Sequence, residues 1–413
     1  MDVSVFTLGC KTNLYESGQI VTALTNMGHN AFLGLKKADV FVLNTCAITK
    51  EAEKKSRQLV ARARKLNPDC KVVVVGCASQ KDSGQFDGIP NVTLVGGVAD
   101  KTKVVQEILR VGVDVEALPT TYSETVFATQ ERTRAFVKIQ DGCNNFCSYC
   151  IVPYLRGRSR SRKIADVVAE VCAANAAETV LIGIDVSQFG KDTGESLPKL
   201  FYALASCDVK TRFRLGSLEE SVVTDELLKS LTTVDFCPHF HLSLQSGSDT
   251  VLKRMNRKYT TEQYFAAVNN IREVFPDAAI TTDVIVGFCG ETEEEFKQTC
   301  DFVQKVRFAD IHVFPYSPRE GTVAFGWQDV DAATKSARAE TLGKIKLQLK
   351  AAFDAKFIGQ TKAVLVEEKK NGLWQGYTPE YVRVHMEGAL SSGSVVQVKL
   401  TKLHGDGLWG EVV

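Results

Sequence analysis

Three cysteines at short, unequal spacing constrain this chain more than any other feature. They are Cys143, Cys147 and Cys150, in a C-x₃-C-x₂-C pattern. Iron–sulfur clusters are usually held by cysteine thiolates, and a protein that only carries electrons normally supplies four of them. A loop that offers three thiolates therefore predicts a cluster with one iron left open to another ligand.

A structural zinc ion is the main alternative for this triplet. Zinc takes four ligands, usually as paired cysteine units or together with histidines. No histidine lies near the triplet, and the next cysteine is Cys172, in a segment expected to be helical. We therefore favour the open iron–sulfur cluster.

The residues around the triplet resemble the signature of radical S-adenosylmethionine enzymes, C-x₃-C-x-aromatic-C, with Tyr149 at the aromatic position. Residues 141–157 are similar to the methylthiotransferase branch of that superfamily. The resemblance implies that S-adenosylmethionine chelates the open iron and that an electron from the cluster cleaves it to a 5′-deoxyadenosyl radical. It also implies that Tyr149 packs on the adenine. The cofactor carries the hard chemical step, and the protein binds and orients it.

Composition restricts the compartment more than the function. The chain has 413 residues, 44% of them hydrophobic and 24% charged, which is an ordinary globular profile for two to four domains. There is no signal-like N-terminus and no long apolar run, so we expect a soluble cytoplasmic protein with no membrane partner. Cytosolic thiols stay reduced, so twelve cysteines indicate metal binding or catalysis.

A cluster of cations follows the triplet, although the net charge of +1 gives no general bias toward nucleic acid and DNA is not expected as a partner. Arg156, Arg158, Arg160 and Arg162 lie at alternate positions directly after the cysteine loop. Neutralising phosphates is what drives nucleic-acid binding, so these four arginines are candidates for RNA contact. The alternative is a solvated, charged surface.

Residues 1–112 alternate apolar strands with helices, which predicts an α/β domain with an open parallel sheet. Three of its strands end at Cys10, Cys46 and Cys77. Ligands bind at the carboxyl ends of parallel strands, so we expect these cysteines to converge, although a lone buried cysteine is most often a packing residue. Residues 7–17, 44–49 and 75–77 resemble the N-terminal domain of methylthiotransferases, which implies a second, auxiliary [4Fe–4S] cluster with an open iron.

Six strand–helix units within residues 130–356 predict a partial (β/α)₆ barrel with its chemistry at the carboxyl ends of the strands. The triplet follows the first of these strands. Asp185, Ser217, Glu219 and Gln245 follow later ones, where each could also be a turn or capping residue. The resemblance implies that they contact S-adenosylmethionine.

Residues 357–413 contain short strands between glycines, which predicts a small antiparallel, OB-like β-barrel. This segment resembles the TRAM domain of tRNA-modifying members of the family. Its aromatic residues Trp374, Tyr377 and Tyr381 could stack on unpaired bases, although core packing is the more ordinary role. A purely structural cap is the alternative.

The resemblance implies a transferase that places a methylthio group on an unactivated carbon, with electrons from a donor such as flavodoxin or ferredoxin. Residues 9–17 and 240–247 resemble the enzymes that act on N⁶-threonylcarbamoyladenosine in tRNA and yield its 2-methylthio derivative. Isopentenyladenosine in tRNA and a ribosomal-protein aspartate are alternative substrates. A non-catalytic iron–sulfur protein that binds RNA or senses redox state is the alternative of another class.

Overall fold

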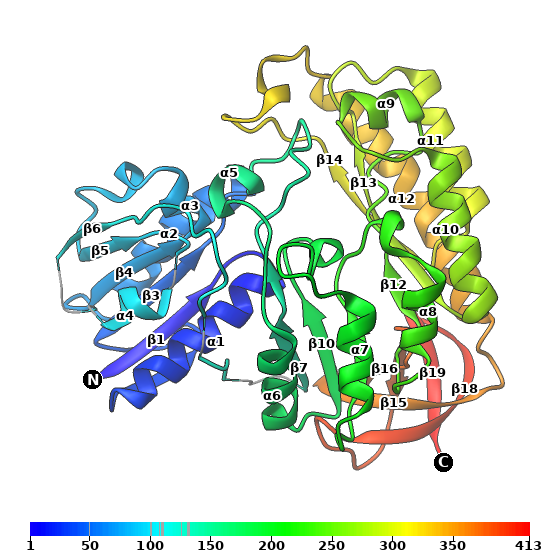
Figure 1. The fold of residues 1–413 in the computed structure, drawn as a ribbon, viewed down its shortest axis with the longest axis horizontal. Coiled ribbons are helices and arrows are strands. Elements are labelled where there is room, and N and C mark those ends of the chain that lie inside the picture. The colour runs from blue at the N-terminus through cyan, green and yellow to red at the C-terminus, as the bar shows by residue number, and fades with distance from the viewer. Residues whose placement is uncertain (49, 100, 107, 109–110, 125, 130–132) are drawn as a thin grey trace.

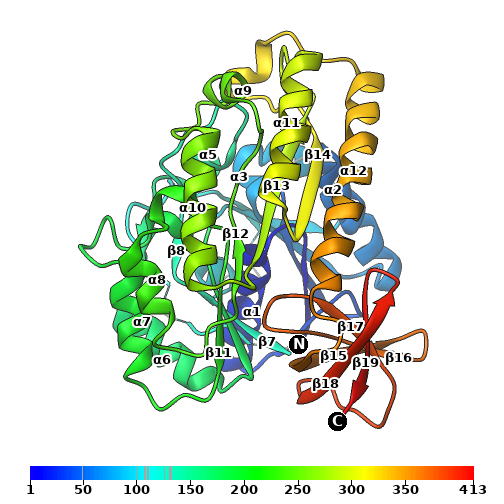
Figure 2. The same cartoon turned by 90° about the vertical axis from the view of Figure 1, so that its right-hand side faces the viewer.

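The computed structural model describes residues 1–48, 50–99, 101–106, 108, 111–124, 126–129 and 133–413. The chain forms an N-terminal α/β domain, a central partial barrel and a small C-terminal β-barrel (Figure 1). The N-terminal domain lies beside the central barrel, and the C-terminal domain lies at one end of it (Figures 1 and 2). This arrangement confirms the predicted fold class. The predicted domain boundary at residue 130 lies outside the described residues.

The N-terminal domain contains a six-stranded parallel sheet in the order β2-β1-β3-β4-β5-β6. Its strands are β1 (Asp2–Thr7), β2 (Asn30–Leu33), β3 (Val40–Thr45), β4 (Lys71–Gly76), β5 (Val92–Gly96) and β6 (Gly112–Asp114). Its helices are α1 (Lys11–Asn26), α2 (Lys50–Leu66), α3 (Cys77–Lys81) and α4 (Lys101–Gln106), with a 3₁₀ turn η1 (Gly84–Phe86). Val42 shares a buried cluster with Ile20 of α1, and Leu43 shares another with Leu59 of α2. Both faces of the sheet are therefore covered, as continuous apolar strands require.

The central barrel is built from two three-stranded parallel sheets, β11-β10-β7 and β12-β13-β14, linked by isolated bridges between β11 and β12. Its strands are β7 (Arg134–Lys138), β10 (Glu178–Ile182), β11 (Arg212–Leu215), β12 (His239–His241), β13 (Ala279–Val286) and β14 (Asp310–Pro315). A short antiparallel pair, β8 (Gln140–Asp141) and β9 (Arg160–Ser161), brackets the cysteine loop. The six barrel strands match the six predicted units.

Helices cover the outside of this barrel and enclose its largest hydrophobic core. They are α6 (Ile164–Ala174), α7 (Leu197–Ala205), α8 (Asp225–Leu231), α9 (Asp249–Arg254), α10 (Thr261–Val274), α11 (Glu293–Val306) and α12 (Ala332–Ala355), with 3₁₀ turns η2 (Val186–Gln188), η3 (Glu220–Val222) and η4 (Val323–Gly326). The short helix α5 (Val152–Arg156) instead packs against the core of the N-terminal domain. The side chain of Thr292 accepts from the backbone of Glu295, whose side chain accepts from the backbone of Thr292. This capping box fixes the start of α11. Among the described residues, no helix combines the length and apolar character needed to cross a membrane.

The C-terminal domain is a closed five-stranded barrel in the order β15-β16-β17-β19-β18. Its strands are β15 (Thr361–Lys370), β16 (Leu373–Tyr377), β17 (Arg383–Met386), β18 (Val395–His404) and β19 (Gly407–Val412). Tyr381 stacks on His239 with ring centroids 4.6 Å apart, and Arg214 donates to the carbonyl of Pro379 at 3.0 Å. Arg212 donates to the carbonyl of Tyr377 at 3.1 Å. The domain therefore covers the amino-terminal end of the central barrel.

Candidate active site between the N-terminal domain and the barrel

Glycines turn the first group of cysteines toward one another at the ends of β1 and β4. Gly9 and Gly76 have φ angles of +107° and +108°, a region that L side chains rarely adopt. A Cβ atom on Gly9 would lie 2.9 Å from the Cβ of Cys46, and one on Gly76 would lie 2.6 Å from the carbonyl oxygen of Thr45. Only glycine lets these strand ends approach so closely, and each is followed directly by a cysteine.

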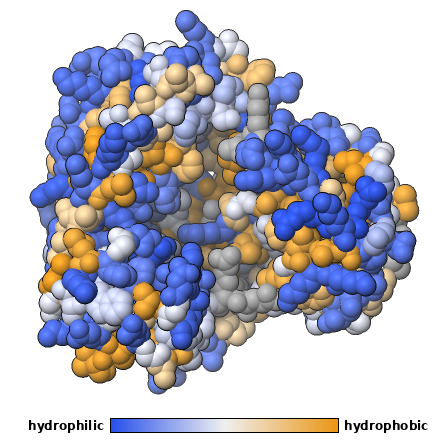
Figure 3. Space-filling view, turned by 180° about the vertical axis from the view of Figure 1, so that it is seen from behind, coloured by the Kyte–Doolittle hydropathy of each residue, from blue (hydrophilic) through white to orange (hydrophobic). Residues whose placement is uncertain are grey.

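The cysteines at the ends of β1, β3 and β4 line one cavity, as the sequence predicts. The lining residues are Cys10, Asn13, Cys46, Ile48, Cys77, Ile151, Val152, Leu155, Arg156 and Ile184. Residues 151–156 begin directly after the second cysteine group, so the two groups are neighbours across the domain interface. Figure 1 shows α5 between the two domains, and Figure 3 shows the surface hollowed between them.

The second cysteine group is held by backbone contacts from both of its ends. Cys143 donates its N–H to the carbonyl of Gly157 at 3.1 Å, and Cys150 donates to the carbonyl of Cys147 at 3.0 Å. Gly142 has a φ of +72°, and a Cβ there would lie 2.0 Å from the carbonyl oxygen of Arg158. The backbone of the loop is therefore closed on itself by its own contacts.

Polar side chains from successive strand ends converge on this loop. The side-chain amide of Asn145 donates to a carboxylate oxygen of Asp185 and to one of Glu219, each at 3.0 Å. Arg257 forms an ion pair with Glu219 at 2.7 Å and donates to the sulfur of Cys147 at 3.3 Å. Burial, followed by the neighbouring Glu219 charge, raises the pKa of Asp185 to about 6. The predicted residues Asp185 and Glu219 thus lie together beside the triplet.

The other predicted cofactor residues are placed less directly. Tyr149 packs against the buried cluster that contains Phe288, with ring centroids 6.3 Å apart. Gln245 is buried, has a φ of +68°, and exchanges backbone hydrogen bonds of 2.9 Å with Asp283 and Ile285 of β13. Ser217 is exposed at the end of β11. The structure therefore brings Asp185 and Glu219 into direct contact with the loop, while the roles of the other three residues stay predictions.

The predicted RNA contact is wrong for Arg156, Arg160 and Arg162. All three are buried, with 1–3% of each residue exposed. Arg160 pairs with Asp141 at 2.8 Å, and Arg162 pairs with Glu170. Only Arg158 is exposed, and its guanidinium lies 4.3 Å from the ring centroid of Phe146. Carboxylates inside the protein satisfy three of the four cations, so these cannot reach a phosphate.

Arg156 connects the two domains beside the first cysteine group. It donates to Glu16 of α1 at 2.8 and 3.2 Å, to Asp141 at 3.1 and 3.2 Å, and to the side chain of Asn13 at 2.6 Å. Lys138 also pairs with Glu16, at 3.1 Å. Burial opposes the charge of Glu16, but Arg156 and the two neighbouring lysines hold its pKa well below the ordinary value. The contacts join α1 to the barrel through buried charges.

Sequence reasoning missed several residues that complete this site. Arg257 lies in the turn after α9, more than a hundred residues from the triplet, and no motif marks it. Glu16 lies within the run 7–17, which was singled out for Cys10 and for its resemblance to the family, without a role for Glu16 itself. Asn145 lies inside the triplet, so its position between the cysteines was the one available signal.

Both cysteine groups suit an iron–sulfur cluster by the chemistry of their donors. The lining of the first cavity contains three thiols and neither histidine nor carboxylate, which favours soft, thiolate-bound metal over calcium or magnesium. Burial raises the pKa of Cys46 to about 11, and that of Cys150 to about 12. Metal binding requires thiolates, so it would release these protons.

Comparison with known families agrees with the three-part architecture. Residues 2–97 match the family described as "Uncharacterized protein family UPF0004", residues 137–303 match the radical SAM superfamily, and residues 355–413 match the TRAM domain. A solved structure of similar fold is the radical S-adenosylmethionine methyltransferase TsrM from Kitasatospora setae. It has a TM-score of 0.58 and 14% identity, covering 78% of this chain and 77% of that one. This likeness concerns the fold alone.

Curated relatives cover nearly the whole chain. Threonylcarbamoyladenosine tRNA methylthiotransferase MtaB of Bacillus subtilis (strain 168) is 37% identical over 97% of this chain and 94% of its own length. The enzyme of the same name from Thermotoga maritima is 35% identical, over 94% and 91%. The tRNA-2-methylthio-N(6)-dimethylallyladenosine synthase of Thermoanaerobacter sp. (strain X514) is 35% identical, over 98% and 92%. The chain therefore belongs to the radical SAM methylthiotransferase family, whose members are transferases.

Proposed function

We propose that the chain transfers a methylthio group to C2 of N⁶-threonylcarbamoyladenosine beside the anticodon of tRNA, giving the 2-methylthio derivative. The observation that carries the proposal is the joining of two three-cysteine groups across one domain interface. Radical SAM enzymes use S-adenosylmethionine and a [4Fe–4S] cluster, and methylthiotransferases have a second cluster. When bound, these groups supply the radical that removes the C2 hydrogen and the methylthio group that replaces it.

We assign the two cysteine groups to the two clusters. Cys143, Cys147 and Cys150 would hold the cluster that binds S-adenosylmethionine, and the cysteines of the first cavity would hold the auxiliary one. Asp185 and Glu219, fixed by Asn145 at 3.0 Å, would bind polar groups of S-adenosylmethionine. Arg257 would orient Glu219 and place its positive charge beside the sulfur of Cys147. Tyr149, Ser217 and Gln245 are proposed to complete this cofactor site.

The curated relatives support tRNA as the substrate, and they include enzymes named for two different adenosines. We favour the threonylcarbamoyl form on the resemblance of the sequence around Cys10. The dimethylallyl form is the second candidate because relatives named for it are also 35% identical. We further propose a cytoplasmic location and an external electron donor of the flavodoxin or ferredoxin type.

The test uses anaerobically purified protein with reconstituted clusters, and two tRNAs that differ only in the modified adenosine. We expect about eight irons per chain, since two [4Fe–4S] clusters are required. With dithionite and S-adenosylmethionine, mass spectrometry of digested tRNA should find the methylthio group on the threonylcarbamoyl nucleoside. Transfer only to the dimethylallyl nucleoside would refute the substrate assignment. Intact clusters without 5′-deoxyadenosine release would favour a non-catalytic sensor.

A further inference from the structure

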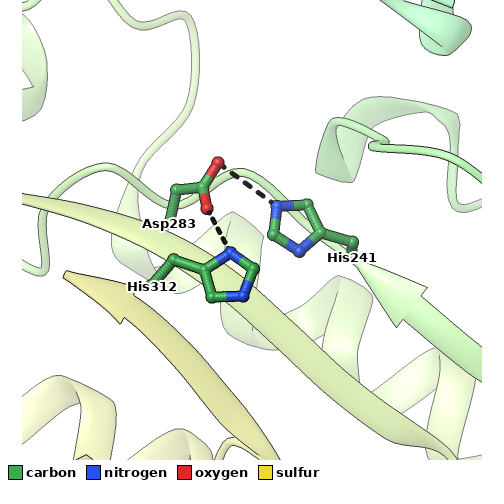
Figure 4. A group of neighbouring side chains, drawn as sticks. All are labelled: His241, Asp283 and His312. Carbon is green, nitrogen blue, oxygen red and sulfur yellow. Dashed lines mark hydrogen bonds and ion pairs between the residues drawn. The ribbon is translucent and has the colours of Figure 1, made fainter. Parts of the chain in front are cut away.

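A polar group of three side chains lies inside the central barrel, apart from both cysteine groups. Asp283 of β13 lies between two imidazoles, and each of its carboxylate oxygens contacts one of them (Figure 4). The Nε2 atom of His241 on β12 lies 3.3 Å from one oxygen, and the Nδ1 atom of His312 on β14 lies 3.1 Å from the other. Asp283 and His312 are register partners on adjacent strands.

The alternation of side chains along β13 places this group on the inner face of the barrel. Ile280 and Val284 belong to the large core that the outer helices cover. Thr281 and Asp283 therefore point to the opposite, inner side. The side chain of His312 is 55% exposed and that of Asp283 is 30% exposed, so solvent reaches the group. Gln245, in the proposed cofactor site, follows the same strand as His241.

Asp283 holds the two imidazoles in a defined orientation. His241 contacts the hydroxyl of Thr281 through Nδ1 at 3.1 Å, which occupies its second nitrogen. His312 contacts Asp283 through Nδ1, and among the described residues no hydrogen-bond partner is found for its Nε2. Hydrogen bonding to Asp283 raises the pKa of His312 although burial opposes this, which favours the imidazolium form. A protonated Nε2–H is a donor for an anion.

Other charges that face the group come from neighbouring elements. Burial and the charges of Arg214 and Arg134 lower the pKa of Lys11, whereas Glu178 and Asp283 oppose that shift. Asp283 is thus one of the charges that act on Lys11, at the start of α1. Asp310 and Lys346 act on His312 in opposite directions and pair with each other at 3.1 Å.

The two candidate nucleosides differ in charge at the substituent on N⁶, which a protonated imidazole would recognise. The threonylcarbamoyl substituent ends in a carboxylate, whereas the dimethylallyl substituent is apolar and uncharged. Arg156, Arg160 and Arg162 are committed to buried ion pairs, whereas the Nε2 atom of His312 has no hydrogen-bond partner among the described residues. Hydrogen bonds between charged partners are the stronger ones and discriminate well against a neutral analogue.

We propose that His312, held by Asp283, binds the threonyl carboxylate of the substrate nucleoside through its Nε2 atom, while His241 positions Asp283 from the other side. This inference rests on the proposed function and names the residue that selects the substrate. His312 acts as a specificity-determining residue. It holds the anionic end of the nucleoside inside the barrel and leaves its adenine ring toward the carboxyl ends of the strands.

The test is a binding measurement on the full chain with both clusters reconstituted under anaerobic conditions. Two labelled anticodon stem-loop RNAs serve as probes, one with N⁶-threonylcarbamoyladenosine and one with its methyl ester. By fluorescence anisotropy we expect the natural enzyme to bind the acid about tenfold more tightly than the ester, the change given by one charge-assisted hydrogen bond. His312→Gln should lose most of this preference, and His241→Gln should weaken it. His29→Gln, beyond the far end of α1, is the matched control and should keep it.

The possible failures are distinguishable. If the natural enzyme methylthiolates threonylcarbamoyl tRNA yet binds acid and ester equally, the proposed function stands and this inference is wrong. The inference is also wrong if both imidazole variants keep the tenfold preference with full iron content. A divalent ion beyond the cluster irons, lost in His312→Gln, would show a metal site instead. If only dimethylallyl tRNA is modified, the proposed function itself fails.

Discussion

Replacing Arg156 by methionine tests whether buried charges hold the N-terminal domain against the barrel. Methionine has comparable length and no charge, so the change removes the hydrogen bonds to Glu16, Asp141 and Asn13 while roughly conserving volume. Glu16 and Asp141 would remain buried with fewer partners. Leaving a buried charge without its partner destabilises a protein by more than the intact buried ion pair stabilises it.

The size of the effect follows from the partners that remain. Breaking a buried ion pair by removing one member costs about 3–5 kcal/mol. Lys101 and Lys138 still contact Glu16, and Arg160 still contacts Asp141, so we expect the lower end of that range. A cost of about 3 kcal/mol corresponds to a roughly 150-fold larger population of the separated state.

Hydrogen exchange measured by mass spectrometry on the full chain reads this population directly. Amides of α1 should exchange roughly 150-fold faster in Arg156→Met, under conditions in which the exchange rate is proportional to the population of the separated state. Amides in α10, on the far side of the barrel, should be unaffected. Arg158→Met is the matched control, because Arg158 is exposed and surface changes cost about 0.5 kcal/mol or less. Equal exchange of α1 in the two variants would refute the view that Arg156 joins the domains.

Two further predictions concern other buried charges. Arg257→Leu removes a hydrogen-bond donor and a positive charge 3.3 Å from the sulfur of Cys147. The reduction potential of the bound cluster, measured by EPR-monitored titration, should therefore fall in this variant, whereas Arg257→Lys keeps the charge and should keep a potential close to that of the natural protein. An unchanged potential in the leucine variant would contradict this. Burial opposes ionisation of Glu178, but Arg214 and Arg134 hold its pKa at about 2, below the ordinary 4.5. The ionised carboxylate therefore stabilises the folded state fully above pH 4.5, and this stabilisation is lost as the pH falls toward 2. Glu178→Gln should therefore lower the melting temperature at pH 7, and the two melting curves should converge on acidification; a constant difference between them would contradict the assignment.

The convergence of Cys10, Cys46 and Cys77 could be predicted from the sequence without knowing the order of the strands in the sheet. Continuous apolar runs imply a parallel sheet, and every parallel strand ends at the same edge. The edge strands β2 and β6 were not predicted. β2 is four residues long and partly exposed, and β6 is three residues long, so neither carries a continuous apolar run.

The arginine run shows where sequence reasoning fails. A cluster of cations can be counted along the chain, but the pattern does not show which carboxylates neutralise it. Glu16 lies 140 residues from Arg156, and Glu170 and Asp141 meet their arginines only once helix α6 and the cysteine loop have folded. The same limit applies to His241, Asp283 and His312, which lie on three separate strands. Tyr377 and Tyr381 also differ from the base-stacking role that their type allowed, because they stack on each other at 4.6 Å and pack against Arg134.

The C-terminal domain packs on the first residues of the barrel strands, and this limits where substrate can enter and leave the barrel. Tyr381 and the arginines of β7 and β11 fill that end of the barrel. A nucleotide therefore cannot pass through the barrel from one end to the other. The modified RNA has to leave, and the next one has to arrive, on the sides that the C-terminal domain does not cover.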